Sequence, residues 1–235
     1  MRVLAVGDSF TAGAELPDYQ ATSSHRDITS KFAWPILLAN INNWSVDNFG
    51  KGGASNDRSI RVVFDEIGNN YDLIIVAWTT YDRFEISKTN NEGRAEDIET
   101  INVNFNLVQK MSPKLDWALD YYLQHNDRFY NYQKWLRQII MLQSYFKQIN
   151  QKYLFCNTFG IMSDLQQDSY DKFMSKLEYL TKQIDSKYYA GWPQWGFFEW
   201  MGDCPKAASG HPLELGHQRI AERINEYIRH LGWIS

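Results

Sequence analysis

The sequence predicts an α/β protein, a three-layer α/β/α sandwich with a central parallel sheet of about five strands. Short apolar runs typical of buried parallel strands recur along the chain, and amphipathic helical segments separate them. Strands that alternate with helices build βαβ units, whose right-handed crossovers place helices on both faces of one sheet. A chain of 235 residues, 44% of them hydrophobic, is sufficient for one large domain with a full core.

Four segments have the composition of buried strands, and four others have the apolar spacing of helices. The strands are expected at residues 2–6, 44–49, 73–78 and 153–156. The helices are expected at residues 32–41, 56–67, 127–150 and 213–231. The run from Leu73 to Trp78 has the clearest strand signal because every residue in it is apolar.

One segment interrupts this alternation. Residues 84–126 are rich in Asn and Glu and contain only short apolar clusters. We interpret them as an insertion that lies over the carboxyl edge of the sheet, where the active site is expected. The insertion belongs to a single domain that spans residues 1–235, because the sequence contains no linker and no internal repeat.

Charge and composition argue against several classes of function. With 24 Lys and Arg against 28 Asp and Glu, the chain has a net charge of -4 and no basic block, so no nucleic-acid partner is expected. No stretch approaches the roughly 20 apolar residues that cross a bilayer. The chain turns polar at Gly7 and Asp8, too early for a signal peptide, so we expect a cytoplasmic protein. Cys156 and Cys204 are too few for a disulfide framework or a metal cage, and we expect no metal and no cofactor.

Residues with chemical potential follow the predicted strands. Ligands of an open α/β sheet bind outside the carboxyl ends of its strands. Ser9 follows the first strand, and a turn with Gly50, Gly52 and Gly53 follows the second, where positive φ angles are expected. His211 lies late in the chain, just before the last helix. A serine, a glycine turn and a histidine at one edge would supply a nucleophile, oxyanion donors and a general base.

Three sequence blocks resemble those of the SGNH (GDSL-type) hydrolases. The segment from Gly7 to Gly13 reads G-D-S-F-T-A-G and resembles the first block, G-D-S-x-T-x-G. Residues 48–55 resemble the second block, and the run from His211 to His217 resembles the last, in which the base precedes a proline. The first block is not the G-x-S-x-G nucleophile elbow of the α/β-hydrolases, because its fifth position is Thr11.

The resemblance implies acyl-ester chemistry on a flavodoxin-like fold. Ser9 would be the nucleophile and His211 the base, and the backbone N–H groups of Ser9 and Gly53 would form the oxyanion hole. The expected partner is a small-molecule or carbohydrate ester, with O-acetyl groups on carbohydrate as the first choice. Hydrolysis and transfer of the acyl group both fit this pattern.

Two positions depart from the family pattern. The third block is G-x-N-D in the family, but Tyr81 stands at the Asn position here. A replacement oxyanion donor would be the hydroxyl of Thr80 or of Tyr81, and Thr80 is the chosen candidate. The family also has an Asp three residues before the histidine, where this chain has Ala208. The nearest acidic residue upstream is Asp203, which we therefore expect to orient His211.

The aromatic content, 15% of all residues, suggests where substrate would bind. Seven aromatic residues lie between Tyr188 and Trp200, and they form either a sugar-stacking wall or a loop packed by its own side chains. Trp192 and Trp195 are the best candidates for a platform. The other residues expected to contact substrate are Asp8, Trp78 and Tyr81, and Asp8 is also expected to order the turn that carries Ser9.

Two other functions remain open at this point. Because both the Asn and the Asp of the family pattern are replaced, the chain could be a non-catalytic SGNH-fold module that binds glycan or a protein partner. A third interpretation is an assembly or virion-associated protein encoded by a phage, suggested by the Asn- and Trp-rich composition. A serine-directed probe separates the enzyme from the binding module.

Overall fold

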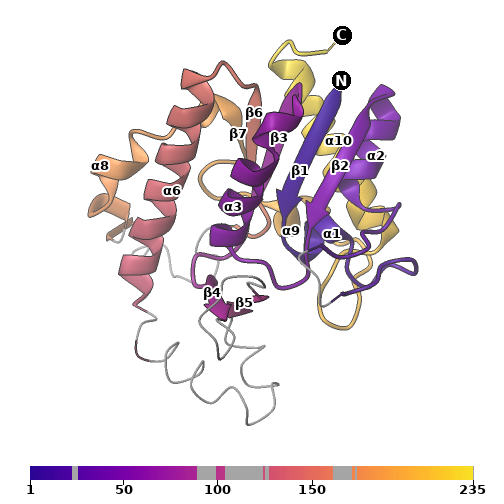
Figure 1. Cartoon of the computed structure of the whole chain (residues 1–235), viewed down its shortest axis with the longest axis horizontal. Coiled ribbons are helices and arrows are strands. Elements are labelled where there is room, and N and C mark those ends of the chain that lie inside the picture. The colour runs from indigo at the N-terminus through magenta and orange to yellow at the C-terminus, as the bar shows by residue number, and fades with distance from the viewer. Residues whose placement is uncertain are drawn as a thin grey trace.

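A five-stranded parallel sheet forms the centre of the protein. The computed structural model of the chain describes residues 1–22, 26–88, 99–103, 124, 127–160, 171–172 and 174–234. The strand order is β2-β1-β3-β6-β7, and every neighbouring pair is parallel (Figure 1), which confirms the predicted class and strand number. The strands are Arg2–Gly7 (β1), Ser45–Gly50 (β2), Leu73–Trp78 (β3), Tyr153–Asn157 (β6) and Tyr189–Ala190 (β7).

Helices cover both faces of this sheet (Figure 1), as the alternating pattern predicts. On β1, Val3 and Ala5 pack with the helices of one face, while Leu4 and Val6 pack with those of the other. The first face carries Trp34–Asn42 (α2), Phe197–Met201 (α9) and Glu214–His230 (α10). The second carries Asn56–Glu66 (α3), Arg128–Gln148 (α6) and Glu178–Thr181 (α8). The short helices are Ser9–Ala12 (α1), Ile67–Asn69 (η1) and Ser186–Tyr188 (η3).

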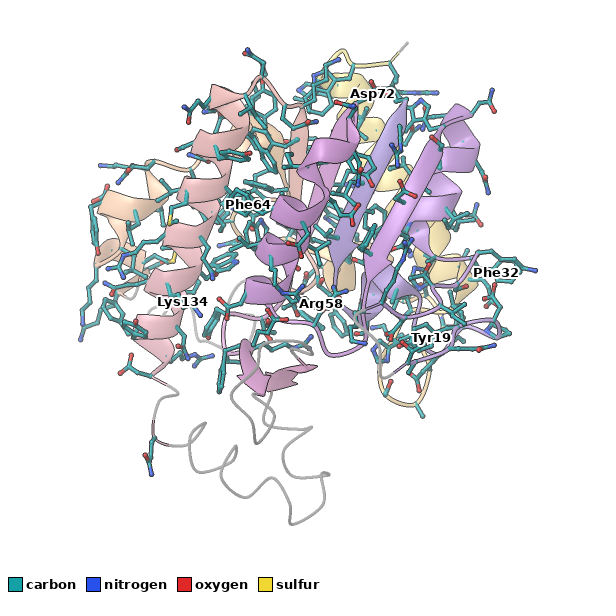
Figure 2. The ribbon with its side chains drawn as sticks, viewed as in Figure 1. Tyr19, Phe32, Arg58, Phe64, Asp72 and Lys134 are labelled. Carbon is teal, nitrogen blue, oxygen red and sulfur yellow. The ribbon has the colours of Figure 1, made fainter. Side chains whose placement is uncertain are left out.

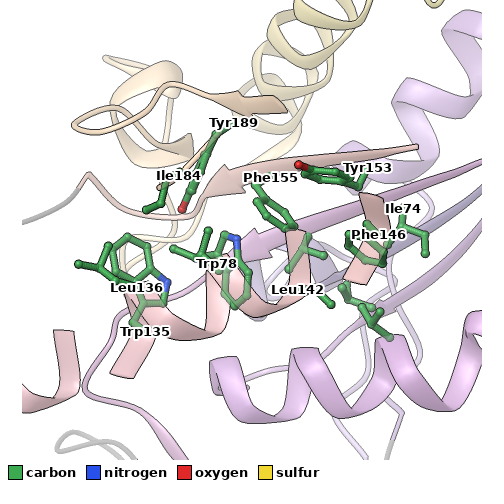
Figure 3. Packing of buried hydrophobic residues seen from close by; sticks show 14 of the residues in the cluster. Ile74, Trp78, Trp135, Leu136, Leu142, Phe146, Tyr153, Phe155, Ile184 and Tyr189 are labelled. Carbon is green, nitrogen blue, oxygen red and sulfur yellow. The ribbon is translucent and has the colours of Figure 1, made fainter. Parts of the chain in front are cut away.

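Aromatic side chains fill the space between the sheet and α6. Figure 3 shows Trp78 and Phe155 of neighbouring strands in this layer, and their rings meet edge to face with centroids 5.4 Å apart. Tyr189 of β7 packs on Phe155 in the same geometry. Rings in these orientations gain electrostatic attraction in addition to the area they bury. Much of the aromatic content therefore stabilises the core.

The predicted insertion begins as a hairpin beside α3. Phe84–Lys88 (β4) pairs antiparallel with Glu99–Val103 (β5) in a separate two-stranded sheet. Arg61 of α3 binds Glu85 through two nitrogens, at 2.8 and 3.1 Å, which fixes the first strand of the hairpin to the domain. Figure 1 shows both strands beyond the carboxyl ends of β1 and β2. The rest of residues 84–126 lies outside the described residues, apart from residue 124.

The order of the strands determines where a ligand can bind. From β1 the chain crosses through α2 to β2 at one edge, then returns through α3 to β3 on the other side of β1. The connections on the two sides of β1 therefore run over opposite faces. Such a switch point opens a crevice at the carboxyl ends of the strands. The residues that follow β1 and β3 line this position. No helix in the described part of the chain is both long and apolar enough to cross a membrane.

The end of β2 lies in direct contact with α1. A Cβ atom on Gly50 would lie 2.3 Å from the backbone nitrogen of Ala12, so no side chain fits. The expectation that all three glycines of this turn need positive φ is wrong for Gly50 and Gly52, and holds for Gly53, whose φ is 73°. Gly50 is instead required by the close approach of two backbone segments.

We expect Gly50→Ala to lower the free energy of unfolding by about 1–3 kcal/mol, because the added methyl group forces α1 away from β2. Urea denaturation measures the change. Gly68→Ala is the matched control, since a Cβ at Gly68 meets no atom within 4 Å. Equal stability of the two variants would contradict the close contact between β2 and α1.

His217 of α10 is a fully buried neutral base. Its Nδ1 accepts a hydrogen bond from the backbone N–H of Trp34 at 3.2 Å, which joins α10 to the start of α2. Its Nε2 has no partner among the described residues. Burial, together with the nearby His211, lowers the pKa of His217 from 6.5 to about 3.

Acid should therefore destabilise the fold through His217. Between pH 6.5 and about 3 the unfolded chain binds a proton that the folded protein excludes, so stability falls as the pH falls. We expect this residue to contribute a loss of about 3 kcal/mol between pH 7 and 4.5. Denaturant titrations of wild type and His217→Asn measure it, with the exposed His230→Asn as control. An identical pH dependence in wild type and His217→Asn would refute the assignment.

Candidate active site

Ser9 lies directly after β1, at the switch point of the sheet. It is the first residue of α1, and only 7% of its surface is exposed. Its hydroxyl forms no hydrogen bond with any described residue. Most buried polar groups have a hydrogen-bond partner, so a buried hydroxyl without one is uncommon. The Ser9 hydroxyl is therefore available to interact with a ligand.

The Asp8 carboxylate joins the ends of three strands. It is fully buried, and it caps α1 by accepting from the N–H of Phe10 at 3.0 Å. It also accepts from the hydroxyls of Thr79, after β3, at 2.6 Å and Thr158, after β6, at 3.2 Å. Arg83 Nη1 lies 3.3 Å away. The sequence predicts that Asp8 contacts substrate. In the structure, four protein groups instead surround its carboxylate, and solvent does not reach it.

A second buried carboxylate holds the glycine turn. Asp27 accepts from the N–H of Gly52 at 2.8 Å, from the Tyr19 hydroxyl at 2.7 Å and from Lys51 Nζ at 3.1 Å. Burial acts to raise the pKa of Asp27, but hydrogen bonds from the N–H groups of Thr22 and Gly52 outweigh it, so the pKa lies below its usual value. Figure 2 shows Tyr19 on the loop beside the carboxyl end of β2.

Two unpaired backbone N–H groups occur in this region. Neither Ser9 nor Gly53 donates its N–H to any group in the described part of the chain. The turn that carries Gly53 is attached to the end of β1, because Lys51 donates its N–H to the Gly7 carbonyl at 3.2 Å. Within the described ranges, the two N–H groups predicted for an oxyanion hole are thus both free of other partners.

The structure brings His211 next to the helix that carries Ser9. The His211 ring packs on Phe10, with ring centroids 5.5 Å apart. A tight turn precedes it, in which the N–H of Ala207 binds the His211 carbonyl at 2.9 Å. Nδ1 of His211 lies 2.7 Å from Glu15 Oε2, and the Ser209 hydroxyl contacts both groups. No hydrogen bond joins His211 to Ser9 among the described residues.

The carboxylate that contacts His211 belongs to Glu15, whereas the sequence predicts Asp203 in this role. The Asp203 side chain is 94% exposed and forms an ion pair with Arg219 at 3.0 Å. The hydrogen bond from Arg219 lowers the pKa of Asp203. Asp203 is near His211 in the sequence only, because its side chain is directed to Arg219. Glu15 lies 196 residues from His211, and no motif marks it.

Residues at the end of β3 have structural contacts. The Tyr81 hydroxyl accepts from Arg128 Nε at 2.6 Å, and the ring packs on Tyr132, so both interactions direct it toward α6. Trp78 is 1% exposed in the core, and the prediction that it contacts substrate is wrong for that reason. The Thr80 carbonyl accepts from Asn56 at 3.3 Å, which places Thr80 in the loop at this edge.

The two candidate platform tryptophans have different surroundings. Trp192 is half-buried and packs on Tyr189 and Trp135, with centroids at 4.9 and 6.1 Å. Trp195 is 57% exposed and lines a cavity of about 720 Å³ between α9 and α10, together with Trp200 and Tyr227. The residues that line this cavity include neither Ser9 nor His211.

The described residues include no group of three or more His, Cys, Asp and Glu side chains that could hold a metal ion. Cys156 and Cys204 are buried and form no disulfide. Burial raises the pKa of the Cys156 thiol, which keeps it protonated.

Solved esterases share this architecture. The psychrotrophic esterase EstA from Pseudoalteromonas sp. matches with a TM-score of 0.56 and 12% identity, over 99% of this chain and 99% of that one. A carbohydrate esterase family 2 enzyme with a carbohydrate binding domain, from Corynascus thermopiles (Myceliophthora fergusii), matches with a TM-score of 0.52 and 13% identity, over 99% and 67%.

A family two carbohydrate esterase from Clostridium thermocellum, in complex with cellohexaose, matches with a TM-score of 0.51 and 12% identity, over 99% and 65%. No protein-family model and no curated protein sequence matches the chain. The three-dimensional likeness shows that the chain has the fold expected from its resemblance to the SGNH hydrolases.

We expect Asp8→Asn to lower the free energy of unfolding by about 2–4 kcal/mol, because the amide keeps the volume but replaces one of the two acceptor oxygens by an NH2 group, which faces donors that then lack an acceptor. Urea denaturation checks this. The control is Asp65→Asn, which removes an ion pair with Arg61 from a side chain that is 59% exposed and should change stability by less than about 1 kcal/mol. If the two variants lost equal stability, Asp8 would not be the group that joins the strand ends.

Proposed function

We propose that this protein is a serine hydrolase of acyl esters in which Ser9 is the nucleophile and His211 the general base. The observation that carries the proposal is the position of Ser9 at the switch point of the sheet, with His211 packed against the next residue. Neither the hydroxyl nor the N–H of Ser9 has a hydrogen-bond partner among the residues that the structure describes. Nucleophile, base and oxyanion donors at one position are the requirements of acyl transfer.

The first half-reaction forms an acyl-enzyme. Ser9 Oγ attacks the ester carbonyl carbon while its proton moves to His211 Nε2, and a tetrahedral oxyanion forms. The oxyanion collapses, the bond between the carbonyl carbon and the alkoxy oxygen breaks, and the leaving alcohol takes the proton from Nε2. The acyl group is then bonded to Ser9 Oγ. Hydrogen bonds between nucleophile and base are often long without substrate and shorten in the reacting complex.

The second half-reaction releases the acid. Water attacks the acyl carbonyl and transfers a proton to Nε2, and the second tetrahedral intermediate expels Ser9 Oγ, which recovers that proton. The N–H groups of Ser9 and Gly53 stabilise the negative oxygen in both halves, and the Thr80 hydroxyl is the candidate for a third donor. Tyr81 stands where the family pattern has the side-chain amide of an Asn, so the oxyanion hole lacks that donor. Loss of one such donor typically lowers the rate by about 10²–10³-fold.

We assign the substrate class as O-acetyl esters on carbohydrate. Two of the three solved structures compared above are carbohydrate esterases by name. The Lys and Arg residues do not form a block that would favour a polyanionic substrate.

A fluorophosphonate probe tests the nucleophile and base. We expect the wild type to be labelled, Ser9→Ala not to be labelled, and His211→Ala to react about 10³-fold more slowly, because the serine then lacks its base. Release of acetate from acetylated xylo-oligosaccharides measures turnover in the same variants. The control is Ser175→Ala, which changes an exposed serine that binds the Lys172 carbonyl. A wild type that binds no probe would support the non-catalytic glycan-binding module instead.

A further inference from the structure

A histidine that acts as a general base needs a fixed ring orientation. The His211 ring contacts a carboxylate from the other end of the chain, that of Glu15. Glu15 Oε2 lies 2.7 Å from His211 Nδ1. The Ser209 hydroxyl contacts both the carboxylate and Nδ1, so the three groups form a closed triangle. The hydrogen bond from Ser209 is the largest influence that lowers the pKa of Glu15, and the hydrogen bond from His211 adds to it.

The protons in this triangle determine the state of the imidazole. An ionised carboxylate only accepts hydrogen bonds, so both of its partners must donate to it. The Ser209 hydroxyl has a single proton, and His211 must therefore carry its own proton on Nδ1. In that tautomer Nε2 has a free lone pair, which is the form that can remove a proton from a serine.

The backbone at Glu15 is held in an uncommon conformation that permits this contact. Its φ is 68°, in the left-handed region that residues with a side chain rarely occupy. The Ala14 N–H binds the Ser9 carbonyl at 2.9 Å before it, and the buried Leu16 follows it, with its N–H bound to the Gly13 carbonyl at 3.2 Å. Strained residues of this kind concentrate where side-chain placement serves function.

We propose that Glu15, held by Ser209, is the positioning carboxylate of His211, and that it replaces the acid missing from the histidine's own loop. This inference rests on the proposed function of Ser9 and His211. Glu15 and Ser9 then belong to one short segment around α1, so the orienting acid and the nucleophile are held by the same part of the chain. Asp203 takes no part, because its carboxylate is directed to Arg219.

The test is Glu15→Gln, which keeps the size of the side chain and removes its charge. We expect kcat for ester hydrolysis to fall by about 10²-fold or more while KM stays unchanged, because Glu15 touches the base and not the substrate. The ¹⁵N NMR spectrum of histidine-labelled protein should show His211 as the Nδ1–H tautomer in wild type and as a mixture of tautomers in Glu15→Gln. His211→Ala identifies the signal, and Ser209→Ala should give a smaller loss of the same kind.

The outcomes separate this inference from the proposed function. The matched control is Glu178→Gln, whose carboxylate binds Lys182 and is 60% exposed, and it should leave kcat and the His211 signal unchanged. If the wild type is active and Glu15→Gln keeps full kcat and the same His211 tautomer, the role of Glu15 is refuted, while the proposed function of Ser9 and His211 stands. Loss of kcat in Asp203→Asn, and not in Glu15→Gln, transfers the role to Asp203. A wild type that neither binds the probe nor hydrolyses ester removes the proposed function as well.

Discussion

The buried carboxylate of Asp8 is the interaction on which the site depends. Parallel strands are hydrogen-bonded along their length, but their carboxyl ends present loops that need other contacts. Asp8 supplies them by accepting from Thr79 after β3 and Thr158 after β6 while it caps α1. A negative charge inside the protein is tolerated only with several donors, and Arg83 adds a positive charge. Ser9, the next residue, is positioned as a consequence.

The loop between α1 and α2 extends this organisation to the rest of the site. Glu15 at its start contacts His211, and Asp27 near its end holds Gly52 in the turn that carries Gly53. One segment therefore contacts His211 on one side and the turn that carries Gly53 on the other. The close packing of Gly50 on Ala12 connects the same turn to α1. The geometry proposed for catalysis thus belongs to one connected network.

Sequence patterns predicted the elements that local periodicity controls. The apolar run of β3 and the helical stripe of α6 are local signals, and the structure has both elements within a residue or two of the expected positions. The fifth strand was not located, because β7 has only the two residues Tyr189 and Ala190, inside a segment that was interpreted as a loop or pocket wall. Two of its seven aromatic residues, Tyr189 and Phe197, are buried in the core, and only contacts between distant segments reveal that.

The sequence alone determined the class of fold, the positions of Ser9, Gly53 and His211 along the chain, and their resemblance to one family of hydrolases. Those properties follow from residue type, spacing and periodicity. The tertiary structure alone decided that Asp203 faces Arg219, that Trp78 lies in the core and that Glu15 meets His211. Side chains far apart in sequence become neighbours through the path of the whole chain, and no local pattern encodes that path.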